Sequence, residues 1–275
     1  MNIVVGIEDR GLKLAPLIAN RTHDALRKGC LVSIDELNNT QGRLVKVMVT
    51  DSEKNSEKEK AMLCAILADI IIENLQIRHM VQHLKQDYYF LSEKEQCDIL
   101  IKALKRLWYG TLEQKSEVMH CKLDVRQRLS ESLEQNQSGN VMLEGFMRFR
   151  MKDYLDLWGK ELAFCVEEYI KKREYAEFVE ILRLFVKIRI PRVRKVHLCV
   201  DGNGEYLLLD ERLCLLKCKH PRERIDKDDA LLSALVNIAP LSIIVHNKER
   251  FFDARIIETI KDVFGRRVEF SEDMI

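Results

Sequence analysis

Histidine and cysteine side chains gather in one stretch near the carboxyl end of the 275-residue sequence. The candidates for metal ligands are His197, Cys199, Cys214, Cys218 and His220. Zinc prefers such nitrogen and sulfur ligands, but its structural sites usually draw closely spaced cysteine pairs from both arms of a hairpin. This stretch has no such pairs, so isolated strand cysteines that pack as small apolar residues are the favoured interpretation. We therefore expect no metal and no cofactor, and a zinc site is the alternative.

His79 and His83 offer a second possible half-site for a metal, because they lie one helical turn apart. A metalloprotease helix carries glutamate directly after its first histidine, and here that position is Met80. Two solvated histidines are therefore the favoured interpretation.

His246 is a candidate for a catalytic base. It follows an apolar run, residues 242–245, that predicts a buried strand, and Ser271 follows a second run at 268–270. If the two strands are parallel neighbours, both side chains lie beyond the carboxyl ends of the strands, where open parallel sheets bind ligands. No glycine-rich phosphate loop, nucleophile elbow or carboxylate pair accompanies His246. A histidine held by a local hydrogen bond is therefore the favoured interpretation.

Arg150 is the second catalytic candidate, because it falls within an apolar stripe. Residues 140–169 repeat apolar side chains at helical spacing, which predicts one long helix that is covered from two sides. A buried guanidinium needs a partner, since an unpaired buried charge costs several kcal/mol. Glu161 lies three turns away and cannot supply it. A structural clamp between Arg150 and a carboxylate from elsewhere is favoured over a functional role.

Basic side chains form two groups that suit an anion-binding surface. Arg148 and Lys152 lie on one face of the predicted helix, and a second group surrounds Pro191. This second group contains Lys187, Arg189, Arg192 and Arg194. If the two groups meet, they form a patch for nucleic acid, acidic lipid or an acidic protein. A solvated basic connector is the favoured interpretation, because such runs are common where domains join.

The elements that would position these residues fall into three regions. Residues 1–50 predict a small α/β unit, and about five helices in residues 56–190 predict a helical bundle region. In residues 192–275 the apolar period changes to two, a hairpin turn follows at 201–204, and a strand–helix–strand crossover indicates parallel strands. The predicted fold class is α+β: mostly helical, with a small N-terminal α/β unit, a helical middle and a C-terminal mixed β-sheet with helices.

Local signals predict several element boundaries. Capping boxes, Ser56 with Glu59 and Ser92 with Glu95, mark two helix starts. A further helix is expected beyond residue 169, and it must stop before a proline. A third strand is expected at residues 213–217, followed by helices capped by Asp228 or Asp229 and by Asp253, the last of them stopped by Gly265.

Composition limits the class of protein. Apolar residues make up 47% of the chain, which argues against disorder. Forty-five basic residues oppose forty-four acidic ones, so no global field attracts nucleic acid or membranes. The chain shows no secretory leader and no apolar run long enough to span a bilayer, so we expect a cytoplasmic protein with reduced thiols and no transmembrane segment.

Three segments in the second half of the chain resemble the YtxC-like sporulation proteins of endospore-forming bacteria. The first contains Glu144-Gly145-Phe146, Phe149-Arg150 and Lys152-Asp153-Tyr154. The second and third contain Ile238-Ala239-Pro240 with Ile243-Ile244-Val245-His246, and Glu258-Thr259-Ile260-Lys261-Asp262-Val263-Phe264-Gly265. The resemblance implies a role in sporulation, and the family supplies no activity to transfer.

The function expected from these features is a non-catalytic interaction or regulatory protein that acts during spore formation and binds a protein partner. The alternative is an enzyme or binding protein for a phosphate-bearing ligand or nucleic acid, which would use Arg150, His246 and the basic connector.

Overall fold

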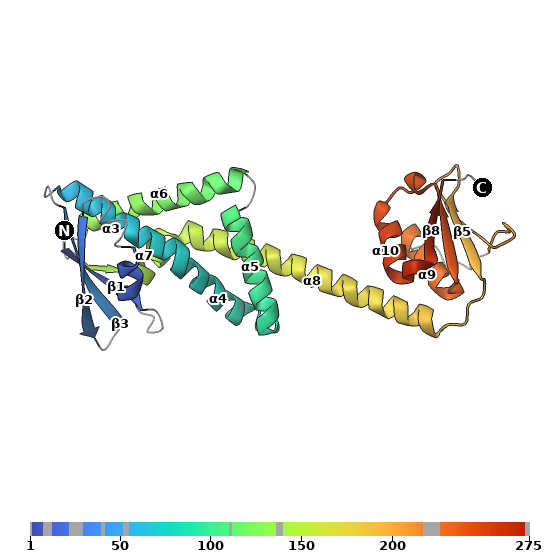
Figure 1. Ribbon diagram of the computed structural model, residues 1–275, viewed down its shortest axis with the longest axis horizontal. Helices are drawn as coiled ribbons and strands as arrows, with labels where there is room; N and C mark the ends of the chain where they lie inside the picture. The colour runs from blue at the N-terminus through green and yellow to red at the C-terminus, as the bar shows by residue number, and fades with distance from the viewer. Residues whose placement is uncertain are drawn as a thin grey trace. The chain divides into compact units, whose positions relative to one another are not determined.

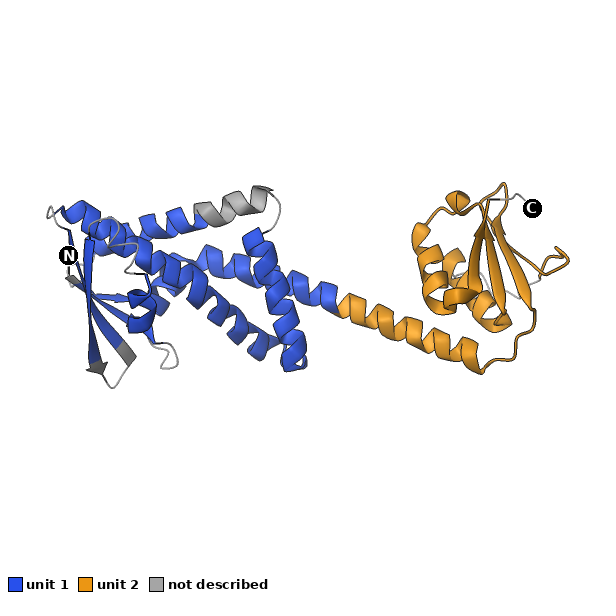
Figure 2. Ribbon diagram, in the orientation of Figure 1, with its two compact units in different colours: residues 1–169 blue, residues 170–275 orange. Residues whose placement is uncertain are grey.

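The computed structural model describes residues 2–7, 13–21, 30–39, 42–51, 55–109, 112–135, 140–216 and 226–272. These residues form two compact units, which divide the chain between residues 169 and 170 (Figure 2). Each unit contains one four-stranded mixed sheet and several helices (Figure 1). The predicted α+β, mostly helical fold class is confirmed. Among the described helices, none combines the length and apolar composition needed to cross a membrane.

The sheet of the first unit has the strand order β2-β3-β1-β4. β1 (Asn2–Ile7) runs antiparallel to β3 (Gly42–Asp51) on one side and parallel to β4 (Asn140–Met142) on the other. β2 (Cys30–Asn39) is ten residues long and pairs with β3. β4 was not predicted at all, and it brings a late segment of this unit beside the first strand.

The first unit contains α1 (Leu14–Ala19), α3 (Ser56–Ile70), a π-helical turn (Ile71–Leu75), α4 (Gln76–Asp87), α5 (Glu93–Tyr109), α6 (Leu112–Gln135), α7 (Leu143–Arg150) and the first part of α8 (Lys152–Ile188). The Ser92–Glu95 capping box is confirmed, because Ser92 N donates to Glu95 Oε2 at 2.7 Å and Glu95 N donates to Ser92 Oγ at 3.4 Å. The cap of α3 is Asn55 instead of Ser56: its side chain accepts from the amides two and three residues later.

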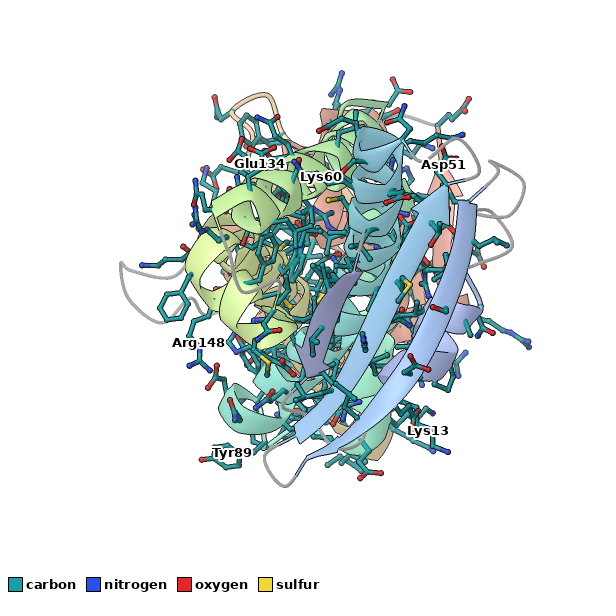
Figure 3. All side chains as sticks on the ribbon, turned by 90° about the vertical axis from the view of Figure 1, so that its left-hand side faces the viewer. Lys13, Asp51, Lys60, Tyr89, Glu134 and Arg148 are labelled. Carbon is teal, nitrogen blue, oxygen red and sulfur yellow. The ribbon has the colours of Figure 1, made fainter. Side chains whose placement is uncertain are left out.

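Polar contacts fasten the amino end of α3 to the sheet and to α6. The carboxylate of Asp51, the last residue of β3, is fully buried and lies 2.9 Å from Lys58 Nζ. The backbone amide of Asp51 donates to Glu59 Oε1 at 2.9 Å. The next residue, Lys60, forms an ion pair with Glu134 of α6 (Figure 3). These contacts set the position of α3 against both neighbours.

The chain leaves the helical conformation at Met151, between α7 and α8, where φ is −129° and ψ is 30°. The prediction of one helix over residues 140–169 is therefore wrong. The prediction of a separate helix beyond residue 169 is also wrong, because α8 continues to residue 188. The predicted cover on two sides is also wrong, since the side chain of Phe149 is 80% exposed. Met151 is neither proline nor glycine, so the sequence carries no signal of the break.

The sheet of the second unit has the order β6-β5-β7-β8. β5 (Lys195–Val200) and β6 (Tyr206–Leu209) form the predicted hairpin, and β7 (Ser242–His246) and β8 (Val268–Ser271) continue the sheet in parallel, as predicted. The strand predicted at 213–217 is reduced, within the described residues, to one isolated bridge between β6 and Leu215.

Helices pack on one face of this second sheet. α9 (Lys227–Ile238), α10 (Ala254–Phe264) and the second part of α8 share a core with buried side chains of the strands, and α8 contributes Val179 and Val186. Asp253 caps α10 as predicted, accepting from Arg255 N at 2.9 Å. Asp226 precedes α9, so the predicted cap at residue 228 or 229 is wrong. Gly265 ends α10 with a φ of +59°, as predicted.

Candidate functional site

Three helices of the first unit enclose a cleft of about 720 Å³. α4 and the end of the π-helical turn contribute one wall, and α7 and α8 contribute the other. The side chains around it are Leu75, Arg78, His79, Gln82, His83, Gln86, Glu144, Met147, Arg148, Leu155, Asp156, Gly159 and Lys160. Concave sites with a few converging polar groups are the usual places where proteins bind small ligands.

Helix geometry explains why these residues line one cleft. On α4 the lining positions 78, 79, 82, 83 and 86 recur every three or four residues, which places them on one face. On α7 and α8 the lining positions follow the same spacing on either side of the break at Met151. The π-helical turn comes directly before α4 and rotates the face that α4 presents; such turns are frequent at functional sites.

His79 and His83 lie in this cleft and are half-buried, so they are less solvated than the sequence suggested. His83 Nδ1 forms an ion-pair contact with Asp87. The ring of His79 lies 6.2 Å from the ring of Trp158. Burial, and then the nearby His83, lower the pKa of His79 below its ordinary value of 6.5. A neutral imidazole at this position can accept as well as donate a hydrogen bond.

Charged side chains of both signs surround the cleft. Arg78, Arg148 and Lys160 supply cations, and Glu144 and Asp156 supply carboxylates. Arg148 and Lys160 are exposed and form no ion pair with any residue that the structure describes. Two cations without an ion pair among the described residues can receive an anionic group of a ligand, beside amide and imidazole groups that can bind its polar atoms.

The Arg–carboxylate clamp expected at Arg150 is made by Arg128 of α6. Its guanidinium donates to both carboxylate oxygens of Asp153 at 2.7 Å, and it lies 2.8 Å from Asp124. It also donates to the backbone carbonyl of Arg150 at 2.6 Å, at the end of α7. The hydrogen-bonded guanidinium of Arg128 lowers the pKa of Asp153, and the clamp holds the α7–α8 break in place.

Arg150 itself is exposed, and its Nη2 donates to Gln135 Oε1 at 2.8 Å. The expectation of a buried guanidinium is therefore wrong. The prediction placed Arg150 on the apolar stripe of a single long helix. The break at Met151 changes the helical phase between α7 and α8, so Arg150 lies outside the buried face.

His246, at the end of β7, forms a pair with His197 of β5. His197 Nδ1 and His246 Nε2 are 2.9 Å apart, and the two rings stack with centroids 5.2 Å apart. His246 is buried, and the strand register places it opposite Ser271, as expected from the sequence. Burial lowers the pKa of His197 below its ordinary value, and the charges of His246 and Lys195 lower it further. The pair holds one shared hydrogen bond in which one ring donates and the other accepts.

The proposed metal ligands are not brought together where they are described. The Sγ of Cys199 lies 3.9 Å from the carbonyl of Leu207, and Cys214 is exposed. Cys218 and His220 lie outside the described residues. Within the part of the chain that the structure describes, no group of three His, Cys, Asp or Glu side chains is placed to hold a metal ion.

The six basic residues of the predicted anion-binding patch belong to different units. Arg148 and Lys152 are exposed in the first unit, and Arg148 lines the cleft. The others are exposed in the second unit, at the end of α8 and in the connector to β5, and they are Lys187, Arg189, Arg192 and Arg194.

Comparison with known proteins gives the family. The family model for the YtxC-like family matches residues 61–269. The chain belongs to the YtxC-like family. It is also 25% identical over 215 residues to the uncharacterized protein YtxC of Bacillus subtilis (strain 168), an alignment that covers 74% of each chain. No solved structure matches the chain.

The matched region of this YtxC-like protein begins within α3 and therefore contains the whole cleft and the histidine pair. The strands β1, β2 and β3 precede it. Sequence reasoning recognised Glu144 and Arg148 only as parts of a motif or a charged face, and it did not connect them with His79 and His83. The spacing of polar groups on α4, every three or four residues, was the available signal, but only the fold shows which helices face each other.

Proposed function

We propose that this YtxC-like protein is a non-catalytic interaction protein that acts in the cytoplasm during spore formation. Its resemblance to sporulation proteins supports the biological setting. The observation that carries the interaction role is an exposed apolar surface on the second part of α8, which we call the outer stripe. It consists of Phe178, Ile181, Leu184, Phe185 and Ile188.

The outer stripe lies on the side of α8 that faces away from the core of the second unit. Its side chains are between 45% and 68% exposed and recur at helical spacing, whereas Val179 and Val186 on the other side are buried. A contiguous row of large exposed apolar side chains is uncommon on a protein that acts alone, and helices with such a row are frequent partner-binding elements.

The basic connector extends this surface. Ile190 is 87% exposed between Arg189 and Arg192, and no acidic residue occurs between residues 181 and 200. Apolar anchors surrounded by charges give a binding surface both affinity and a preferred partner, because the apolar side chains are buried on binding while the charges select the partner.

The proposal predicts that spore formation depends on the outer stripe. In an otherwise unchanged strain, Ile181→Lys places a charge on the stripe at a side chain that is 54% exposed. We expect this variant to fold and accumulate normally while spore yield falls, because a buried unpaired charge would oppose partner binding.

The matched control is Phe252→Lys, which changes a fully exposed aromatic residue of the same unit outside α8. Spore yield should be unaffected by this control. Normal spore yield with Ile181→Lys, at wild-type protein levels, would contradict the proposed function.

A second candidate function is the binding of a phosphate-bearing ligand in the cleft of the first unit. The observation that favours it is the presence of Arg148 and Lys160, two cations without ion-pair partners among the described residues, on the rim of a cleft that also presents His79 and Gln82. Arginine and lysine are the usual phosphate-binding side chains.

A further inference from the structure

The outer stripe carries a charge pattern that is complementary to itself. Towards the start of the stripe, α8 presents Glu174, Glu177 and Glu180 on its exposed surface. Towards the end, it presents Lys187, and Arg189 follows directly after the helix. The middle of the stripe lies between positions 183 and 184. Within α8, Glu177 pairs with Arg173 and Glu180 pairs with Arg183, and all charged residues from the middle of the stripe to the end of the helix are basic.

An antiparallel pairing of two such helices brings opposite charges together. When two copies meet about a two-fold axis at the middle of the stripe, position 180 of one lies opposite position 187 of the other, and position 177 lies opposite position 190, next to Arg189. In an antiparallel helix pair, residues that border the apolar stripe on the same side of each helix are neighbours. Glu180 and Lys187 border the outer stripe on the same side. A parallel pairing would instead place like charges together.

We infer that the outer stripe joins two copies of the chain through antiparallel α8 helices. This inference rests on the proposed function, in which the stripe is an interaction surface, and it names the partner as a second copy. The interface is isologous: each copy offers the same apolar row, and each Glu180 faces the Lys187 of the other copy. Glu180 already lies 2.5 Å from Arg183 within its own helix, an exposed contact that leaves its second oxygen for Lys187.

The acidic half of the stripe argues against an anionic membrane as the occupant. Amphipathic helices that lie on acidic lipid usually carry lysine and arginine along their whole polar face. Here Glu174, Glu177 and Glu180 border the stripe and would be repelled by such a surface. The same three carboxylates are favourable opposite the basic half of a second copy.

The size of the stripe predicts a weak dimer. Five large side chains over three helical turns span roughly 16 Å of helix. Standard stable interfaces bury about 800 Å² on each partner, and a single helix pair of this length falls at or below that value. We therefore expect dissociation constants on the order of micromolar, so that the dimer population depends on concentration.

The test is the mass of the purified full chain by light scattering or sedimentation equilibrium, at concentrations from about 1 to 100 μM. The expected result is a shift from the chain mass of 32.3 kDa to twice that value as concentration rises. Ile181→Lys should remain monomeric throughout, and Phe252→Lys should dimerise like the wild type. A monomeric wild type over the whole range would overturn the inference.

Charge reversal tests the antiparallel arrangement. Glu180→Lys alone and Lys187→Glu alone should each weaken dimerisation by roughly three- to tenfold, because each creates two like-charge contacts. The double variant should restore dimerisation to near the wild-type level, and failure to restore it would overturn the antiparallel pairing.

These results are separable from the proposed function. A monomeric wild type whose Ile181→Lys variant still lowers spore yield overturns the dimer and retains the interaction role with another partner. A dimer that Ile181→Lys dissociates without any effect on spore yield retains the dimer and overturns the role in spore formation.

Discussion

The rings of His197 and His246 cannot both be fully protonated without losing the hydrogen bond between them. Each ring would then carry two N–H donors and no acceptor, and two like charges would lie in stacked rings. The pair is therefore stable only while at least one ring is neutral, which makes it sensitive to acid.

This sensitivity gives a prediction for the free energy of unfolding. Burial lowers the pKa of His197 in the folded chain below its ordinary value of 6.5. Between that value and the lower folded pKa, the unfolded chain binds more protons, so the free energy of unfolding decreases as the pH falls through this window. Between about pH 7.5 and pH 5.5, we expect the free energy of unfolding to decrease less in His197→Gln than in the wild type.

Urea unfolding at several pH values measures this difference. His79→Gln provides an independent comparison, because burial also lowers the pKa of His79. In this variant too, the free energy of unfolding should depend less on pH than in the wild type. Equal decreases in the wild type and in His197→Gln would show that the histidine pair does not couple folding to protonation.

The two arginines around the α7–α8 break show what a sequence can and cannot predict about a single residue. The amino-acid pattern predicted that Arg150 itself is buried and binds a carboxylate. That prediction is wrong, and the clamp beside Arg150 is made by another arginine. It belongs to Arg128, because Met151 interrupts the helical phase on which the burial of Arg150 was inferred. Partners distant in sequence, such as Arg128 and Asp153, follow from the packing of α6 on the break and have no local signal.

Helices and strands with their own capping or turn residues were predictable, and those set by tertiary contacts were not. α5, α10 and the β5–β6 hairpin begin or end at Ser92, Asp253, Gly265 and Gly204, whose side chains or backbone freedom act locally. β4 forms only because β1 supplies a paired edge. A three-residue strand has too little local preference to be recognised against the helix that follows it.

The same distinction applies to the cleft. Its polar residues were visible on α4, α7 and α8 separately, but the angle between these helices depends on the π-helical turn and on the break at Met151. Neither feature contains proline or glycine at the point of change. The lining could therefore be found only once the three helices were placed together.

The cleft predicts binding of inorganic phosphate that depends on its two rim cations. Arg148→Ala and Lys160→Ala should each weaken phosphate binding by about tenfold, because a charge-assisted hydrogen bond contributes roughly 1.5–3 kcal/mol. Lys152→Ala is the matched control, since Lys152 is an exposed cation next to the same break but outside the cleft. Isothermal titration of the full chain with phosphate is the measurement. Weakening of equal size in all three variants would indicate general charge attraction and would contradict a specific site.

Across the whole molecule, α8 takes part in both compact units, and the YtxC-like match extends from the first into the second. The sequence predicted an apolar helix in the middle of the chain and a basic segment after it. It did not predict that five of the large apolar side chains remain outside the core, because helical periodicity identifies apolar faces without showing how many neighbours cover them. An exposed stripe on a helix whose other face is buried is a property of the assembled fold.

The most direct measurement of the central claim, that the outer stripe is an interaction surface, is site-specific photo-crosslinking in sporulating cells. A photoreactive side chain is introduced at Leu184 on the stripe or, as the matched control, at Phe252 in the same unit. We expect a discrete crosslinked species from position 184, at twice the mass of the chain, and none from position 252. The absence of a crosslink from position 184, or the same products from both positions, would contradict it.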